Sequence, residues 1–218
     1  MDDPNQLIRT IAVLALPLLF AITVHEAAHG YVARMLGDTT ASMLGRVTLN
    51  PIKHIDPVGT LIVPTALFLF TGFVLGWAKP VPVNTRNLRR PKRDMAVVAI
   101  AGPAANLVMA LCWGLVLKLG LMLQGGLDWV ATPLVSMGNI GIVINLILMV
   151  LNLLPIPPLD GGRVMAGVLP LAAARWLDRV ERYGLIILVG LLMTGVLGQI
   201  ISPAVAMFRA VIMRLLGL

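Results

Sequence analysis

Long apolar segments dominate this chain and restrict it to folds that a lipid bilayer can hold. Five such segments lie at about Leu7–Met35, Val58–Trp77, Met95–Leu123, Met137–Leu154 and Gly184–Ile201. A helix needs roughly 20 apolar residues to cross a bilayer. Hydrophobic residues make up 58% of the chain and charged residues only 12%, which excludes a typical soluble domain. We predict an all-α integral membrane protein, a multi-pass bundle of about four to six transmembrane segments.

The second apolar segment allows two topologies. Pro64, Gly72 and Gly76 interrupt it, and irregular backbone is tolerated at membrane depth where protein or a wet cavity surrounds it. If this segment crosses fully, the first and fourth segments run antiparallel; if it is re-entrant, they run parallel. Before it, "RVTL" (Arg46–Leu49) alternates apolar and polar residues. That pattern predicts a short membrane-associated β-ribbon next to the re-entrant segment.

The remaining sequence indicates one membrane-embedded domain over residues 1–218, with a core at 7–169 and a C-terminal transmembrane helix and tail at 183–218. We expect the end of that tail to lie along the membrane surface. The basic loop Lys79–Arg93 is predicted to be cytoplasmic. The net charge of +7 suits contact with anionic lipid. Nucleic acid is not an expected partner, because the basic residues lie in loops without interleaved aromatic residues.

The sequence "HEAAH", His25–His29, lies inside the first apolar segment. His25 and His29 are four residues apart, so both imidazoles lie on one face of a helix and can bind one metal ion. Glu26 points to a different part of the helix surface and can reach a metal-bound water without being a ligand. This is the H-E-x-x-H arrangement of zinc metalloproteases.

A structural role for these residues is the alternative. Intramembrane histidines often only hydrogen-bond to a neighbouring helix, and a five-residue pattern with two open positions arises by chance in soluble chains. An ionisable residue at membrane depth, however, costs about 3 kcal/mol. Two of the chain's three histidines and a glutamate fall within one helical turn here. The membrane context therefore favours a metal site.

A catalytic zinc needs a third protein ligand and one open position. Three candidates lie near an apolar segment, namely His54, Asp56 and Asp160. Asp160 lies near the end of "NLLPIPPLDGG", Asn152–Gly162. The prolines of this stretch forbid a regular helix, and the two glycines after Asp160 allow a sharp backbone turn. A broken helix with an acid at the break can direct a ligand into a buried site. The alternative is an ordinary turn in which Asp160 caps the next helix.

These motifs together carry a resemblance. "HEAAH" and "NLLPIPPLDGG" resemble the paired motifs of the site-2 protease family of intramembrane zinc metalloproteases. "AGPAANL" (Ala101–Leu107) is similar to the glycine–asparagine core helix of that family. "GRVTLNPIKHIDPVGT" and "GWAKPVPVN" resemble its short branch, which lacks PDZ and CBS domains.

The resemblance implies roles for individual residues. His25, His29 and Asp160 would bind one Zn²⁺ per chain, and Glu26 would be the general base. Asn106 and Asn152 would lie near the site, either as oxyanion or substrate contacts or as helix–helix hydrogen-bonding residues. His54 is open to three roles, as a fourth ligand, a substrate contact or a gating residue of the ribbon. We favour a structural or gating role, in which His54 is a hydrogen-bonding member of the ribbon, because a fourth protein ligand would close the open position.

The resulting hypothesis is hydrolysis of peptide bonds in transmembrane protein substrates, in a prokaryotic plasma membrane. A homo-oligomer is left open by the sequence. A divalent-cation transporter is the main competitor, because intramembrane His and Asp ligands suit it as well, but it has no need for Glu26. A catalytically silent scaffold is the second competitor, and the complete ligand set with Glu26 argues against it.

Overall fold

The computed structural model describes residues 4–63, 65–66, 69 and 76–218. Its long helices are α1 (Pro4–Met35), α4 (Pro91–Met122), α5 (Asp128–Leu153) and α9 (Val196–Leu216). Shorter helices are α2 (Thr40–Met43), α6 (Asp160–Val168), α7 (Leu171–Glu181) and α8 (Gly184–Met193). Single turns of other helix types are η1 (Pro51–His54), η2 (Pro57–Ile62) and η3 (Thr85–Asn87).

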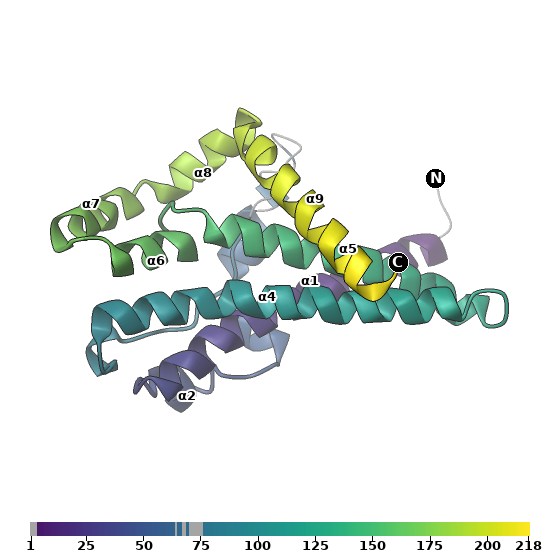
Figure 1. Ribbon diagram of the computed structural model, residues 1–218, viewed down its shortest axis with the longest axis horizontal. Coiled ribbons are helices and arrows are strands. Elements are labelled where there is room, and N and C mark those ends of the chain that lie inside the picture. The colour runs from purple at the N-terminus through teal and green to yellow at the C-terminus, as the bar shows by residue number, and fades with distance from the viewer. Residues whose placement is uncertain (1–3, 64, 67–68, 70–75) are drawn as a thin grey trace.

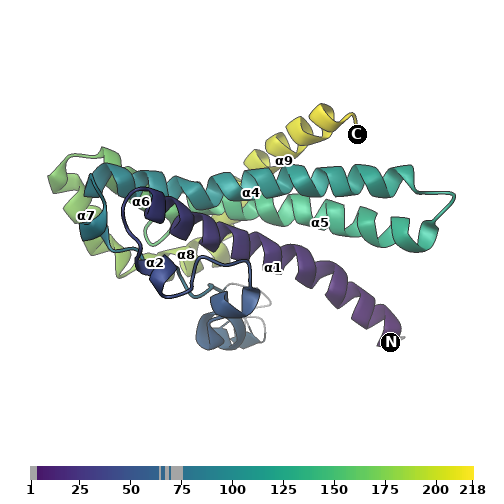
Figure 2. The same cartoon turned by 90° about the horizontal axis from the view of Figure 1, so that it is seen from below.

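Three long helices, α1, α4 and α5, form the centre of the molecule. Figures 1 and 2 show α1 and α5 running in the same direction, with α4 antiparallel to both. This is the parallel arrangement that the sequence ties to a second apolar segment that does not cross. Part of the predicted re-entrant path, at positions 64, 67–68 and 70–75, lies outside the described residues.

Small residues allow α4 and α5 to approach closely. A Cβ on Gly138 would lie 2.6 Å from the Leu117 Cβ, and one on Gly141 would lie 2.2 Å from the Trp113 ring. In lipid the hydrophobic effect does not drive helices together, so helices associate through close van der Waals packing, which such glycines allow. The buried cluster that forms around this contact also includes Ile142, Leu146 and Ile212, so α9 completes the core.

Four described helices are long and apolar enough to cross a membrane. They span Val13–Met35, Pro91–Met122, Asp128–Leu153 and Val196–Leu216. The prediction of a multi-pass α-helical membrane protein is confirmed at this level.

The C-terminal segment differs from the prediction. The sequence suggested a span over Gly184–Ile201 followed by a surface tail, but α8 ends at Met193 and α9 is the long helix. Gly195 takes a left-handed conformation at φ 74° and breaks the apolar run. The apolar side chains of α9, including Phe208, Ile212 and Leu216, then pack on the core. The tail therefore belongs to the bundle.

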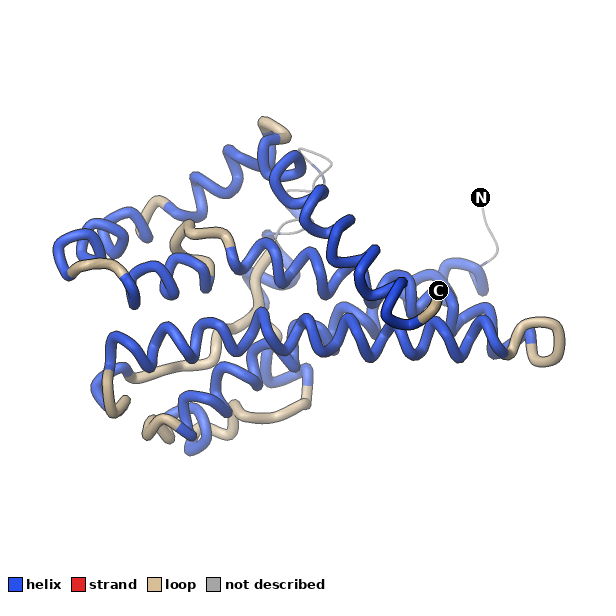
Figure 3. The backbone as a smooth tube through the Cα atoms, in the orientation of Figure 1, coloured by secondary structure: helices blue, strands red, loops and turns tan. Residues whose placement is uncertain are grey.

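The predicted β-ribbon does not form in the described residues. Arg46–Leu49 and residues 79–84 are irregular backbone, and Figure 3 shows only helix and loop there. Pro80 and Pro82 lack the N–H groups that a strand ladder requires. The carbonyl oxygen of Lys79 accepts a hydrogen bond from the side chain of Arg46 and not from the backbone N–H of a partner strand, with an N–O distance of 2.7 Å.

Candidate metal centre

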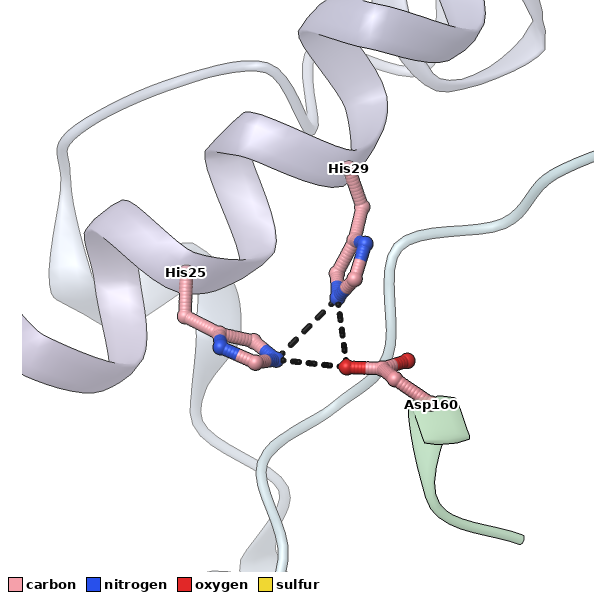
Figure 4. Close-up of side chains that lie close together, drawn as sticks. All are labelled: His25, His29 and Asp160. Carbon is pink, nitrogen blue, oxygen red and sulfur yellow. Dashed lines mark hydrogen bonds and ion pairs between the residues drawn. The ribbon is translucent and has the colours of Figure 1, made fainter. Parts of the chain in front are cut away.

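Three side chains from distant parts of the chain converge at one point. Figure 4 shows His25 and His29 extending from α1 towards Asp160, the first residue of α6. The Nε2 atoms of the histidines are 3.0 Å apart, and each lies 3.2 Å from Asp160 Oδ2. All three residues are buried. The structure thus brings together the three residues that the resemblance names as ligands.

The start of α6 is placed by two glycines in its first turn. A Cβ on Gly161 would lie 2.2 Å from the carbonyl oxygen of Leu154, and one on Gly162 would lie 2.7 Å from the nitrogen of Pro157. Neither glycine has a positive φ. These glycines provide space for close packing, and the sharp turn that the sequence predicted for them does not require a left-handed backbone. This packing holds Asp160 against the histidines.

Hydrogen bonds determine which nitrogen of each histidine carries a proton. His29 Nδ1 lies 2.7 Å from the carbonyl oxygen of Val98, which can only accept, so this nitrogen is the donor. His25 Nδ1 lies 2.6 Å from Asn106 Oδ1. The Asn106 amide nitrogen donates to the carbonyl of Ala21, so its oxygen must face His25. Both neutral imidazoles therefore present an unprotonated Nε2 to Asp160.

Three acceptor atoms then face one another without a proton between them. The Asp160 carboxylate supplies the third of these atoms, 3.2 Å from each Nε2. Its Oδ2 receives no hydrogen bond from the described residues. A cation at the centre of this triangle would satisfy all three acceptor atoms. Ligand atoms of a tetrahedral zinc are roughly 3.3–3.6 Å apart, so these residues fit zinc after shifts of a few tenths of an ångström.

Gly102 of α4 leaves room for an ion at this point. A Cβ at Gly102 would lie 2.4 Å from His29 Nε2 and 2.6 Å from His25 Nε2. Any side chain there would occupy the space in front of the ligand atoms. Sequence analysis singled out the segment Ala101–Leu107 only by resemblance and did not assign this glycine a role.

Glu26 lies beside the three converging side chains and is not among them. Its Oε2 accepts a hydrogen bond from the Val81 N–H at 2.8 Å. The opposite carboxylate oxygen has no hydrogen-bond partner among the described residues. Glu26 is therefore held by the chain between α1 and α4 with one oxygen engaged and the other available.

Asn106 and Asn152 have different positions. Asn106 is fully buried and contacts His25, and its nitrogen also donates to Asn145 Oδ1 at 2.9 Å. Asn152 bonds only within its own helix, to the carbonyl of Leu148. Sequence analysis missed Asn145, whose nitrogen donates to the carbonyl of Gly141. The available signal was that Asn145 is one of three asparagines in a strongly apolar helix.

His54 is buried but lies outside the three converging side chains. Its Nε2 is 3.0 Å from the carbonyl oxygen of Thr48, and its Nδ1 has no partner among the described residues. It connects two parts of the irregular segment before η2. The predicted gating role stays a prediction.

Known proteins are similar to this chain over most of its length. A protein of Bacillus subtilis (strain 168) that carries the name zinc metalloprotease YwhC is 40% identical over 205 residues, covering 93% of this chain and 90% of its own length. The Mycolicibacterium smegmatis protein named zinc metalloprotease Rip2 is 32% identical over 183 residues, covering 83% of this chain and 66% of its own length.

The model of peptidase family M50 matches residues 121–195 of the chain, which include Asp160. No solved structure matches the chain. The extent of the likeness to YwhC, together with the family match, shows that this chain belongs to peptidase family M50 and is a membrane-embedded zinc metalloprotease with Zn²⁺ as its cofactor.

Proposed function

We propose that this protein hydrolyses peptide bonds of membrane-embedded protein substrates. His25, His29 and Asp160 hold the zinc ion, and Glu26 is the general base. One observation carries the proposal: three buried acceptor atoms converge at 3.0–3.2 Å inside a membrane helix bundle, with an independently held carboxylate beside them.

Each residue has a defined contribution. Zinc bound there would lower the pKa of a water molecule and polarise the scissile carbonyl. Glu26 takes a proton from the attacking water with its free oxygen and returns it to the leaving amine. Asn106 keeps His25 in the tautomer that presents Nε2. Since all polar atoms of Asn106 are engaged by protein groups, the geometry supports this orienting role over an oxyanion contact.

Substrate entry imposes one further requirement. A transmembrane helix hides its carbonyl groups in hydrogen bonds to residue i+4, so the substrate must unwind before attack. The resemblance to the site-2 protease family implies an extended substrate that pairs with a strand edge. Arg46–Leu49 and residues 79–84 were the candidates for that strand, and neither forms a strand among the described residues, so no docking edge is assigned to them. An Asn152 contact to substrate and a homo-oligomer stay predictions.

The side of the membrane on which the site lies can be inferred from the end of the bundle at which α6 is found. α4 begins beside α6, where the Lys92 amine contacts the carbonyl of Leu169 and a Cβ on Gly167 would lie 2.5 Å from the Ala96 Cβ. The basic residues of the 79–93 loop enter α4 at this end, which the positive-inside rule assigns to the cytoplasm. We place the site towards the cytoplasmic face of a prokaryotic plasma membrane.

The test uses purified protein in detergent with a model transmembrane-helix substrate. Bound zinc and cleavage are measured for wild type, Glu26→Gln and Asp160→Ala. We expect Glu26→Gln to keep zinc and to lose cleavage by on the order of 10²–10⁴-fold. Asp160→Ala should lose both, because only two ligands remain.

Other outcomes would exclude the proposal. Cleavage by Glu26→Gln at the wild-type rate would show that Glu26 is not the base. Zinc binding without cleavage by wild type, combined with zinc uptake into vesicles, would favour a transporter. Wild type without bound zinc would favour a scaffold.

A further inference from the structure

The segment Lys79–Asn84, here called the strap, crosses over Glu26 on its way from η2 to α4. Val81 is its central contact: the N–H donates to Glu26, and the side chain is buried. Gly30 lies one turn further along α1, and a Cβ there would be 3.0 Å from Val81 Cγ1. The strap thus rests on the helix face that carries the proposed base.

Val81 provides the one backbone donor in its part of the strap. Pro80 and Pro82 flank it, and neither has an N–H. Proline also restricts the residue before it to extended conformations, so this part of the strap is stiff. The Val81 N–H is consequently a donor that the strap can direct to a fixed position.

Arg46 holds the other side of the same stretch of backbone. Its guanidinium donates to the Lys79 carbonyl at 2.7 Å and reaches the Pro80 carbonyl at 3.5 Å. Arg46 is only 9% exposed, and no carboxylate pairs with it among the described residues. Burying a guanidinium without an acid partner destabilises the fold, unless hydrogen bonds to protein groups compensate for its lost hydration.

One peptide group connects Arg46 to Glu26. The carbonyl of Pro80 and the N–H of Val81 belong to the same planar unit, whose oxygen faces the cation and whose nitrogen faces the carboxylate. A cation near the oxygen polarises the unit and strengthens its N–H as a donor. Arg46 and Glu26 therefore interact electrostatically through this peptide unit, although the two side chains make no direct contact.

Asp38 anchors the far end of the strap. Its Oδ2 accepts from the Asn84 N–H at 2.6 Å, and its Oδ1 accepts from the Asn87 amide at 2.9 Å. Asp38 lies three residues after the end of α1, so both anchors position the strap relative to the helix that carries Glu26. The strap is fixed at both ends, with Val81 between them.

We propose that Arg46 is a positioning residue for hydrolysis, which acts through the strap by holding the Val81 N–H on Glu26. The inference rests on the proposed role of Glu26 as general base. With one oxygen held by the Val81 N–H, Glu26 keeps a single conformation, and its other oxygen stays available to act as the base. Without Arg46, the carboxylate samples other conformations, and turnover falls while substrate binding is retained.

The first test compares Arg46→Gln, Arg46→Lys and Val81→Pro with wild type. Val81→Pro removes the donor itself while leaving Arg46 in place. We expect Arg46→Gln and Val81→Pro to lower kcat by about 10- to 100-fold, as loss of a supporting hydrogen bond does around metal ligands. KM and bound zinc should stay at wild-type values. Arg46→Lys should restore part of kcat, because lysine can donate to one carbonyl.

Matched controls separate this role from general damage. Val83→Pro places a proline two residues on, where the N–H has no hydrogen bond among the described residues, and should keep kcat. Arg86→Gln removes an exposed arginine near the strap and should also keep kcat. The double variant Arg46→Gln/Val81→Pro should be no slower than the slower single variant, because both changes break one connection.

A second readout is independent of proteolysis. Hydrogen exchange at the Val81 amide should be slow in wild type and faster in both Arg46→Gln and Glu26→Ala. If Glu26→Gln leaves cleavage intact but exchange follows this pattern, the proposed base is wrong and the strap contact is still correct.

Three results would overturn the inference. A rise in KM with unchanged kcat would make the strap a substrate-contact surface. Equal losses of kcat in Val81→Pro and Val83→Pro would show that any disturbance of the strap has the same effect. Unchanged exchange at Val81 in Arg46→Gln would show that Arg46 does not hold this amide.

Discussion

At the residue scale, the metal centre depends as much on a missing side chain as on the ligands. Gly102 lies in front of both imidazole Nε2 atoms, at a distance where a Cβ would meet them within 2.4–2.6 Å. The hydrogen bonds to Val98 and Asn106 prevent the rings from turning away. Both rings are therefore held in place, and the space between them is where the proposed zinc ion would bind.

Replacing Gly102 tests this directly. Gly102→Ala puts a methyl group where the ion must bind, so bound zinc should fall from about one equivalent per chain to a small fraction of that value. Metal analysis of the purified variant measures the effect. Gly198→Ala is the control, because a Cβ there meets nothing within 4 Å, and it should keep its zinc. A Gly102→Ala variant with full zinc occupancy would place the ion elsewhere.

At the element scale, the site depends on how α6 docks against the end of α5. Asp160 is carried by a helix of nine residues, which is too short to be stable by itself. Gly161 and Gly162 let its first turn contact the backbone of Leu153, Leu154 and Pro157. The third ligand is therefore positioned by helix docking and not by its own loop.

A methyl group at Gly161 should move the third ligand. Gly161→Ala collides with backbone that cannot yield, so α6 shifts and zinc affinity should fall by about 10- to 100-fold. Competition with a chelator measures the affinity. Gly190→Ala in α8 is the control, because its Cβ would be in open space. Wild-type affinity in Gly161→Ala would mean that α6 adapts without moving Asp160.

At the scale of the whole molecule, Asp38 ties together segments that the membrane helices leave apart. It joins the end of α1 to the start of α2 and to the 84–87 segment before α4. Burial raises the pKa of this carboxyl, but hydrogen bonds from Thr40, Asn87 and Asn84 outweigh burial and hold the pKa below its usual value.

The sign of the resulting pH dependence follows from linkage. Because the pKa is lower in the folded state, Asp38 stabilises the fold above its unfolded pKa of about 4. That contribution is lost as the pH falls through the folded pKa. At pH 7, Asp38→Asn should lower Tm by roughly 2–4 °C, the shift that 1 kcal/mol gives in a chain of this size.

Thermal unfolding in detergent between pH 7 and pH 3 measures this effect. The Tm difference between wild type and Asp38→Asn should be constant down to about pH 4 and shrink below it. Asp56→Asn is the control, because it caps only the local turn of η2. A difference that grows towards acid would contradict the assignment.

Sequence alone determined the membrane class, the helical fold and the metal-binding residue types. Apolar segments of about 20 residues have no alternative to helices in lipid, and the His25–His29 spacing puts two imidazoles on one face whatever surrounds them. The sequence also predicted Asp160 as the third ligand, because the prolines and glycines around it mark a broken helix between apolar segments, and the structure brings it to 3.2 Å from both imidazoles.

Tertiary structure decided what depends on contacts between distant segments. The parallel course of α1 and α5, the docking of α9 on the core and the space at Gly102 arise from packing that no local pattern encodes. Arg46–Leu49 was misread as a β-ribbon because alternation predicts a strand only where a partner offers its backbone. Here a buried arginine side chain takes that place, and only the assembled molecule brings Arg46, Val81 and Glu26 together.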